Sequence, residues 1–149
     1  MASARVGLFP PVGQRTGGPE ELHVALARNL GLLRRYAAVR DHVTREATEA
    51  GRDPSGFEHA LNVWCGFAAT REAGREPLAT QMQDFYQMPF EPFERCSPYG
   101  TPEDVAEFLG PYIEAGCSAF NVIPCAGDDE SAMAAVGELR TLLTASPKR

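Results

Sequence analysis

Apolar residues recur with the period of an amphipathic helix in five segments of this chain and form short continuous runs in three others. We expect helices within residues 19–31, 36–50, 78–88, 102–115 and 129–143, and strands within residues 5–13, 60–68 and 119–123. Gly31 predicts that the first two helices are separated by a bend or an end. Residues 89–100 are rich in proline and aromatic side chains and predict a packed loop.

Residues 100–116 carry the clearest helix signals. Thr101 is the expected N-cap, Pro102 suits the first helical position, and Asp104 completes a capping box. Gly116 is expected to end this helix, and the run at 119–123 then predicts a strand that is buried on both faces. Five apolar residues at helical spacing predict the inner face of the helix: Val105, Phe108, Leu109, Tyr112 and Ile113.

The alternation of strands and helices continues to the end of the chain. Asp128 or Asp129 is the expected N-cap of the last helix. The continuous run at 60–68 also predicts a strand covered on both faces, as the strands of parallel sheets are. This order favours an α/β fold with parallel strands. The inner face of the last helix is predicted to contain Ala132, Val136, Leu139 and Leu143.

Composition narrows the class of protein further. The chain has 149 residues, the size of one domain, and 44% of them are hydrophobic, which is enough for a core. Its net charge of −6 argues against a nucleic-acid partner, which needs a basic face. No apolar run suggests a membrane span or a signal peptide, so we expect a cytoplasmic protein. The four cysteines lack metal-site spacing, which predicts reduced, mostly buried thiols and no metal site.

Several stretches in the stated order carry a family resemblance. AGRDP closes a helix, an apolar strand follows, and then come FYQMPFEPFERCSPYGTPEDVAEFLGPYIEAG and SAFNVIP. This combination resembles the C-terminal part of luciferase-like monooxygenases, which are flavin- or deazaflavin-dependent enzymes built on a TIM barrel. GTPEDVAEFLGPYIEAG is the strongest match, and TGGPEEL at 16–22 resembles the glycine pair that opens an earlier helix of the family.

The resemblance implies a partial barrel. A TIM barrel needs eight βα units and about 250 residues, whereas the sequence of this chain predicts only three strands. We therefore expect one truncated α/β domain over residues 1–149, with an irregular or strand-forming lead-in at 1–18 and a frayed tail at 144–149. An open half-barrel exposes strand edges, which favours completion by a homodimer or a partner chain. The chain is interpreted as a piece of a full enzyme, a natural short relative, or a relative that lost its redox chemistry.

The resemblance also suggests a function and a cofactor site. A flavin-dependent oxidoreductase acting on a small or medium-sized apolar substrate is the first hypothesis, with FMN or a deazaflavin as cofactor. A cofactor-free relative that serves as a ligand-binding subunit, a partner subunit or an enzyme is the alternative. The glycine pair Gly17 and Gly18, with Arg15 beside it, is the candidate phosphate site, because amides at a helix N-terminus bind anions. A plain loop before a helix explains the same residues.

The candidate substrate pocket draws on strands and on the aromatic loop. Trp64 and Cys65 lie toward the end of a predicted strand, where α/β barrels place their ligands. Asn121 is the polar residue of the last strand and either serves the barrel wall or points at a ligand. A cluster around the proline-rich loop predicts a pocket wall, a dimer interface or a loop core; its members are Phe85, Tyr86, Met88, Phe90, Phe93 and Tyr99. Core packing is the simpler explanation for Trp64 and Cys65.

Overall fold

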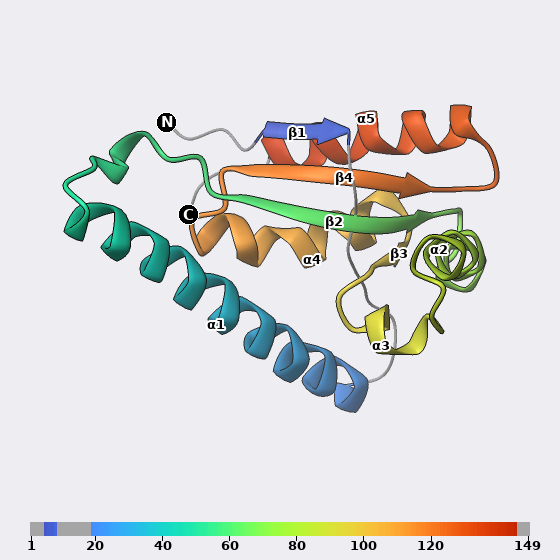
Figure 1. The fold of residues 1–149 in the computed structure, drawn as a ribbon. Helices are drawn as coiled ribbons and strands as arrows, with labels where there is room; N and C mark the ends of the chain where they lie inside the picture. Colours follow the sequence, from blue (N-terminus) through green and yellow to red (C-terminus); the bar gives the residue numbers. More distant parts are fainter. Residues whose placement is uncertain (1–4, 9–18, 146–149) are drawn as a thin grey trace.

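The chain folds into an open parallel sheet flanked by helices (Figure 1). The structure, a computed structural model, describes residues 5–8 and 19–145. The α/β class and the parallel strands predicted from the sequence are confirmed. In chain order the elements are β1 (Arg5–Leu8), α1 (Pro19–Glu49), a 3-10 turn (Pro54–Gly56), β2 (Ala60–Phe67), α2 (Arg71–Tyr86), α3 (Glu91–Glu94), β3 (Tyr99–Gly100), α4 (Pro102–Glu114), β4 (Ala119–Cys125) and α5 (Asp129–Ala145).

The strands lie in the order β1-β4-β2-β3. β4 and β2 form the long central pair, with Val63 opposite Val122, whereas β3 meets β2 only at Gly66 and Phe67. In a closed barrel every strand pairs with the next one along the chain. Among the described strands only β2 and β3 do so, because β4 inserts between β1 and β2. Beside the first part of β2, therefore, no described strand continues the sheet.

Local signals set most helix boundaries. The Thr101 side chain accepts a hydrogen bond from the Asp104 backbone N–H, and the Asp104 carboxylate accepts one from the Thr101 N–H, so the predicted capping box is confirmed. Asp128 accepts from the Ser131 N–H and caps α5, as expected. Thr70 caps α2, which therefore begins at Arg71 rather than near residue 78. The predicted break at Gly31 is wrong, because α1 runs without interruption from Pro19 to Glu49.

Strand alternation divides the core between the two faces of the sheet. The odd-numbered residues Val63, Cys65 and Phe67 of β2 are buried against α4 and α5. Most of the predicted inner faces of these two helices join the same cluster, including Leu109 and Leu139. A second cluster covers the opposite face near the carboxyl ends of the strands. Its members are Leu78, Ala79, Met82, Phe90 and Cys125, with Trp64, Phe93 and Tyr99 packed against them.

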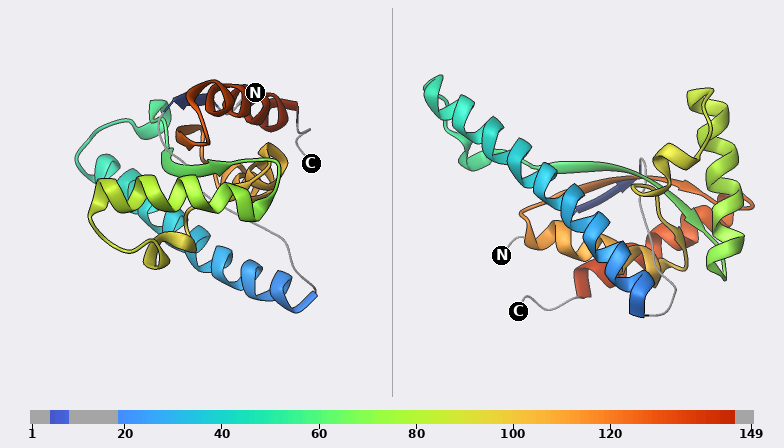
Figure 2. Two further views of the ribbon diagram at one scale, coloured as in Figure 1. Left: turned by 90° about the vertical axis from the view of Figure 1, so that its right-hand side faces the viewer. Right: turned by 90° about the horizontal axis from the view of Figure 1, so that it is seen from below.

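The first half of β2 and β4 is open on that second face. Asn62 and Asn121 are both exposed, and the Asn121 amide donates to the Asn62 side-chain oxygen at 2.8 Å. The expectation that both strands are buried on both faces is therefore wrong. α2 covers only the carboxyl end of the sheet, and α1 and α2 diverge from each other (Figures 1 and 2). The face of the sheet between α1 and α2 is therefore exposed around Asn62 and Asn121.

Candidate functional site

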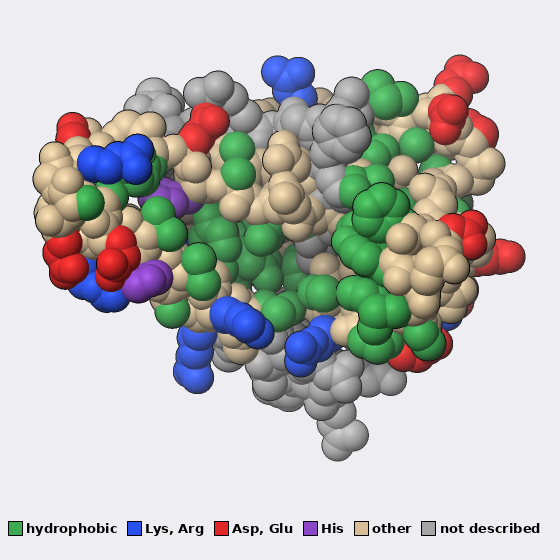
Figure 3. Space-filling model, in the orientation of Figure 1, with side chains coloured by type: hydrophobic (Ala, Val, Ile, Leu, Met, Phe, Trp, Pro, Cys, Tyr) green, Lys and Arg blue, Asp and Glu red, His purple; other side chains and the backbone are tan. Residues whose placement is uncertain are grey.

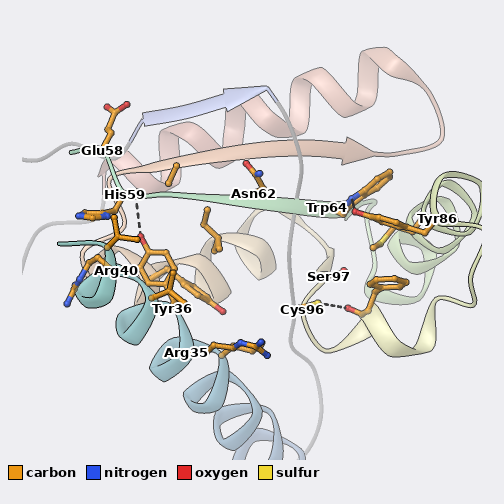
Figure 4. A pocket seen from close by; sticks show the side chains of 18 residues that line it. Arg35, Tyr36, Arg40, Glu58, His59, Asn62, Trp64, Tyr86, Cys96 and Ser97 are labelled. Carbon is orange, nitrogen blue, oxygen red and sulfur yellow. Dashed lines mark hydrogen bonds between the residues drawn. The ribbon is translucent and has the colours of Figure 1, made fainter. Parts of the chain in front are cut away.

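An open cavity of about 620 Å³ lies between α1, β2 and the segment from α2 to β3. Figure 3 shows it as a hollow lined by hydrophobic side chains, and Figure 4 shows the residues around it. This volume falls within the range of about 300–1,000 Å³ that is usual for small-molecule sites. The lining is mostly apolar, with a few polar groups, which is the composition of a ligand pocket rather than of a solvent channel.

One wall of the cavity is a single face of α1. Its members recur at helical spacing, so they share one side of the helix: Leu32, Arg35, Tyr36, Val39, Arg40 and Val43. Tyr36 fixes this wall to the sheet, because its hydroxyl donates to the His59 carbonyl at 3.3 Å and its ring packs edge-on against Tyr112. Two arginines therefore lie within an otherwise apolar stripe.

The two arginines have different surroundings. The Arg40 guanidinium donates to the Ala115 carbonyl and pairs with Asp41 at 2.6 Å, so it ties α1 to the end of α4. Arg35 is exposed and makes no hydrogen bond or ion pair with any residue that the structure describes. It extends from α1 toward Cys96 and Ser97 (Figure 4). Arg35 is thus the cationic side chain of the lining that is available to an anionic ligand.

The opposite wall is aromatic. The Trp64 indole N–H donates to the Tyr86 hydroxyl at 3.1 Å, and the rings of Tyr86 and Phe93 are stacked with centroids 4.9 Å apart. Trp64 comes from β2, Tyr86 from the end of α2 and Phe93 from α3, so three elements join here. Extended aromatic surfaces of this kind favour flat, unsaturated ligands through stacking and edge contacts.

The open edge of β2 supplies backbone hydrogen-bonding groups. The Gly66 and Ala68 N–H groups donate toward β3, to the carbonyls of Pro98 and Gly100, whereas the His59 carbonyl accepts from Ser118 on the β4 side. Backbone groups alternate in direction along a strand. The N–H and C=O groups of Asn62 and Trp64 therefore point toward the cavity side, where no described strand pairs with them.

Two tyrosines of the cavity wall are uncharged. Burial raises the pKa of Tyr112 to about 12, and partial burial together with a hydrogen bond involving Cys117 raises the pKa of Tyr36 well above its usual value. Both hydroxyls stay protonated at physiological pH and can only act as neutral hydrogen-bonding groups. Their environment fits a binding site better than it fits general-base chemistry.

The structure distributes the predicted pocket residues over several places. Trp64 and Phe93 line the cavity. Cys65 does not, because alternation turns it into the core on the other face of the sheet. Asn121 lies on the open face but outside the lining. The proposed phosphate-site residues Arg15, Gly17 and Gly18 lie outside the described residues, as does most of the predicted tail.

Phe90 and Tyr99 support the cavity from behind. Glu94 accepts hydrogen bonds from the Tyr99 hydroxyl and from the Arg75 Nε, both at 2.7 Å. Arg75 also lies over the fully buried Phe90 ring, with its guanidinium carbon 5.1 Å from the centroid. These contacts hold α3 and its Phe93 against α2. Within the predicted aromatic cluster, Phe90 and Tyr99 therefore belong to a loop core, whereas Tyr86 and Phe93 line the cavity.

The carboxyl ends of β2 and β3 are closed by α2. Gly66, Gly74 and Gly100 bring the backbones of β2, α2 and β3 into direct contact; a Cβ on Gly74 would lie 2.7 Å from the Gly100 nitrogen. Barrel enzymes bind their ligands at this end of the strands. In this chain the described cavity instead runs beside the middle and the amino-terminal half of β2.

Sequence reasoning missed Arg35, Tyr36 and His59 in the lining. A signal existed, because Arg35 and Arg40 fall within the apolar stripe of α1 at helical spacing. The predicted break at Gly31 divided this helix, whereas α1 is continuous and carries the whole stripe. Within the described residues no three His, Cys, Asp or Glu side chains come together as a metal site would require. No helix of this part of the chain is long and apolar enough to cross a membrane.

The comparisons with known proteins found no relative, so any proposal about function depends on the fold and the cavity. The chain matches no family model, no curated protein and no solved structure.

Proposed function

We propose that the chain binds a flat aromatic small molecule carrying an anionic group in the cavity beside β2. FMN or a deazaflavin is the ligand class that the luciferase-like resemblance suggests, and the chain would act as, or within, a cytoplasmic flavin-dependent oxidoreductase of partial-barrel type. The observation that carries the proposal is the opposition of Arg35 to the aromatic wall of Trp64, Tyr86 and Phe93 across about 620 Å³.

The groups around the cavity match the parts of a flavin. Its ring system is flat and suits contact with Trp64 and Tyr86. Its pyrimidine edge carries amide-like donors and acceptors, which complement the backbone groups of Asn62 and Trp64 that no described strand pairs. Its phosphate would meet Arg35, since guanidinium groups bind phosphate through charge-assisted hydrogen bonds. When bound, a flavin supplies the redox chemistry, and the protein positions it and a substrate.

Trp64 offers a direct test, because it is the only tryptophan of the chain and lines the cavity. FMN and riboflavin are titrated into the protein, with Trp64 fluorescence and flavin anisotropy as two readouts. We expect saturable quenching by FMN and binding of riboflavin that is about 10- to 100-fold weaker. This ratio corresponds to the ~1.5–3 kcal/mol of a hydrogen bond to a charged group.

Matched variants locate the phosphate contact. Arg35→Gln is expected to remove the preference for FMN over riboflavin. Arg34→Gln is the control, since Arg34 is an exposed neighbour on the same helix that does not line the cavity. Trp64→Phe keeps an aromatic wall and removes the fluorescence signal, so anisotropy alone must still report binding. Absence of saturable binding by FMN and by a deazaflavin in folded protein would refute the flavin assignment.

The closed carboxyl end of the sheet favours a second candidate, a relative without redox chemistry that binds a different aromatic acid. The contact of Gly66 and Gly74 fills the place where a barrel enzyme would hold its cofactor. Such a protein would show the same Trp64 response with aromatic carboxylates and none with flavins. Loss of that response in Arg35→Gln would assign the carboxylate to the same cation.

A further inference from the structure

The end of α2 projects apolar side chains into solvent. Phe85 is 69% exposed and Met88 is 50% exposed, although both are large hydrophobic residues. The chain turns sharply between them, because Gln87 adopts a left-handed conformation with φ of 54°. Residues 84–88 therefore form a protruding tip, here called the α2 tip, and exposed clusters of this kind mark interaction sites.

The α2 tip and the cavity lie on the same face of the molecule. Figure 3 shows hydrophobic side chains gathered over the end of α2, next to the hollow between α1 and β2. Phe85 continues the aromatic wall, since its ring lies 5.4 Å from Trp64 and 4.9 Å from Tyr86. When a projection and a recess lie on one face, two copies related by a twofold axis in that face can each insert the projection into the recess of the other.

Charge adds a specific match. Asp84 immediately precedes Phe85, and its carboxylate has no ion pair or hydrogen bond among the described residues. Arg35, in the cavity lining, likewise has no partner there. The α2 tip thus carries an anionic and an exposed aromatic side chain on consecutive residues. The ligand proposed for the cavity has the same two features.

We propose that a second copy of this chain occupies the cavity, forming a twofold dimer in which each α2 tip enters the cavity of its partner. In this dimer Phe85 packs against the partner's aromatic and valine-lined walls, and Asp84 pairs with the partner's Arg35. The tip imitates the aromatic anion of the proposed function, so ligand binding and dimerisation exclude each other. The competition rests on the proposed function, whereas the dimer itself does not.

The dimer is tested first without any ligand. Sedimentation velocity of the full chain over 1–200 µM is expected to show a concentration-dependent monomer–dimer equilibrium. Phe85→Glu is expected to raise the dimer Kd at least 100-fold. Met133→Glu is the control, because Met133 is 52% exposed but lies on α5, and it should leave Kd unchanged. Circular dichroism must show that both variants are folded.

Charge exchange identifies the contact. Asp84→Arg and Arg35→Asp are each expected to weaken the dimer about tenfold or more, and the double variant is expected to recover most of that loss. A wild-type chain that stays monomeric at 200 µM would overturn the proposal. A dimer that survives Phe85→Glu, or a double variant without recovery, would overturn the placement of the tip in the cavity.

Competition is tested separately with FMN as the probe. If FMN binds, as judged by Trp64 quenching, saturating FMN is expected to shift the wild-type dimer to monomer. A dimer that persists with its Trp64 quenched would overturn mutual exclusion. If FMN does not bind, the proposed flavin function fails, and the dimer is decided by the variants alone.

Discussion

Replacing Gly66 with alanine should destabilise the protein, because three backbones meet at that residue. A Cβ on Gly66 would lie 2.9 Å from the Gly74 carbonyl carbon and 2.9 Å from the Tyr99 Cβ, and closer still to the Gly74 oxygen. Carbon atoms prefer separations of about 3.5–4.0 Å. The neighbours are backbone atoms and the first atom of a side chain, so they cannot move aside by rotation.

The expected cost follows from these contacts. Adding a methyl group to a packed interior costs about 1–3 kcal/mol, and rigid neighbours place Gly66 at the upper end. Alanine in a strand regains about 0.5–1 kcal/mol through lower chain entropy in the unfolded state. The net expectation is a loss of about 2 kcal/mol in the free energy of unfolding. The melting temperature should fall by roughly 4–8 °C, at ~2–4 °C per kcal/mol for a chain of this size.

Gly137→Ala is the matched control. Gly137 lies inside α5, and a Cβ added there would meet nothing within 4 Å, so alanine should stabilise by about 0.5–1 kcal/mol. Urea unfolding of both variants, followed by circular dichroism and Trp64 fluorescence, measures the two free energies at unchanged slope. Opposite signs are expected. A Gly66→Ala protein within about 0.5 kcal/mol of the wild type would refute the close approach of α2 to β2 and β3.

The cysteines and the α5 cap give two further predictions. Cys96 is partly exposed, whereas the other three thiols are buried, and burial raises the pKa of Cys125 to about 12. A thiol reagent at pH 8 should therefore modify Cys96 fast in the native protein, and Cys96→Ser should remove this fast phase. Hydrogen bonds from Ser131 hold the pKa of Asp128 below its usual 3.8. The Asp128 carboxylate therefore stabilises the folded protein above pH 3.8, and this stabilisation is lost as the pH falls through the lower pKa of the folded state. The difference in melting temperature between the wild type and Asp128→Ala should therefore narrow from pH 7 to pH 3; a constant difference would contradict the charged cap.

The helix caps could be predicted from the sequence because the interacting groups lie within a few residues of each other. The Thr101–Asp104 capping box and the Asp128 cap involve groups three positions apart, and both were predicted correctly. The break predicted at Gly31 was wrong because that prediction used the local glycine signal alone. A glycine costs a helix only about 1 kcal/mol, and the packing of Leu33 and Tyr36 against the core outweighs that cost.

Burial was predicted less well than secondary structure. The continuous apolar run of β2 suggested cover on both faces, but α4 and α5 cover one face and α2 covers only the carboxyl end of the other. Asn62 and Asn121 consequently meet each other in solvent. For Cys65 the sequence left open a place beside a ligand or in the core, and the pleat of the strand places it in the core.

The sequence by itself determined the place of most longer helices and strands, the parallel α/β class and most of the caps, because these depend on periodicity and on contacts within one helical turn. It did not predict that α1 is continuous, or that the segment expected to be a loop contains the short elements α3 and β3. Tertiary structure alone decided the strand order and the cavity. Arg35, Trp64 and Phe93 are separated by 29 residues at each step. They share one cavity only because α1 crosses beside the edge of β2 that no described strand pairs, while α3 is held against α2. No local pattern encodes such a meeting, since it results from how whole elements pack.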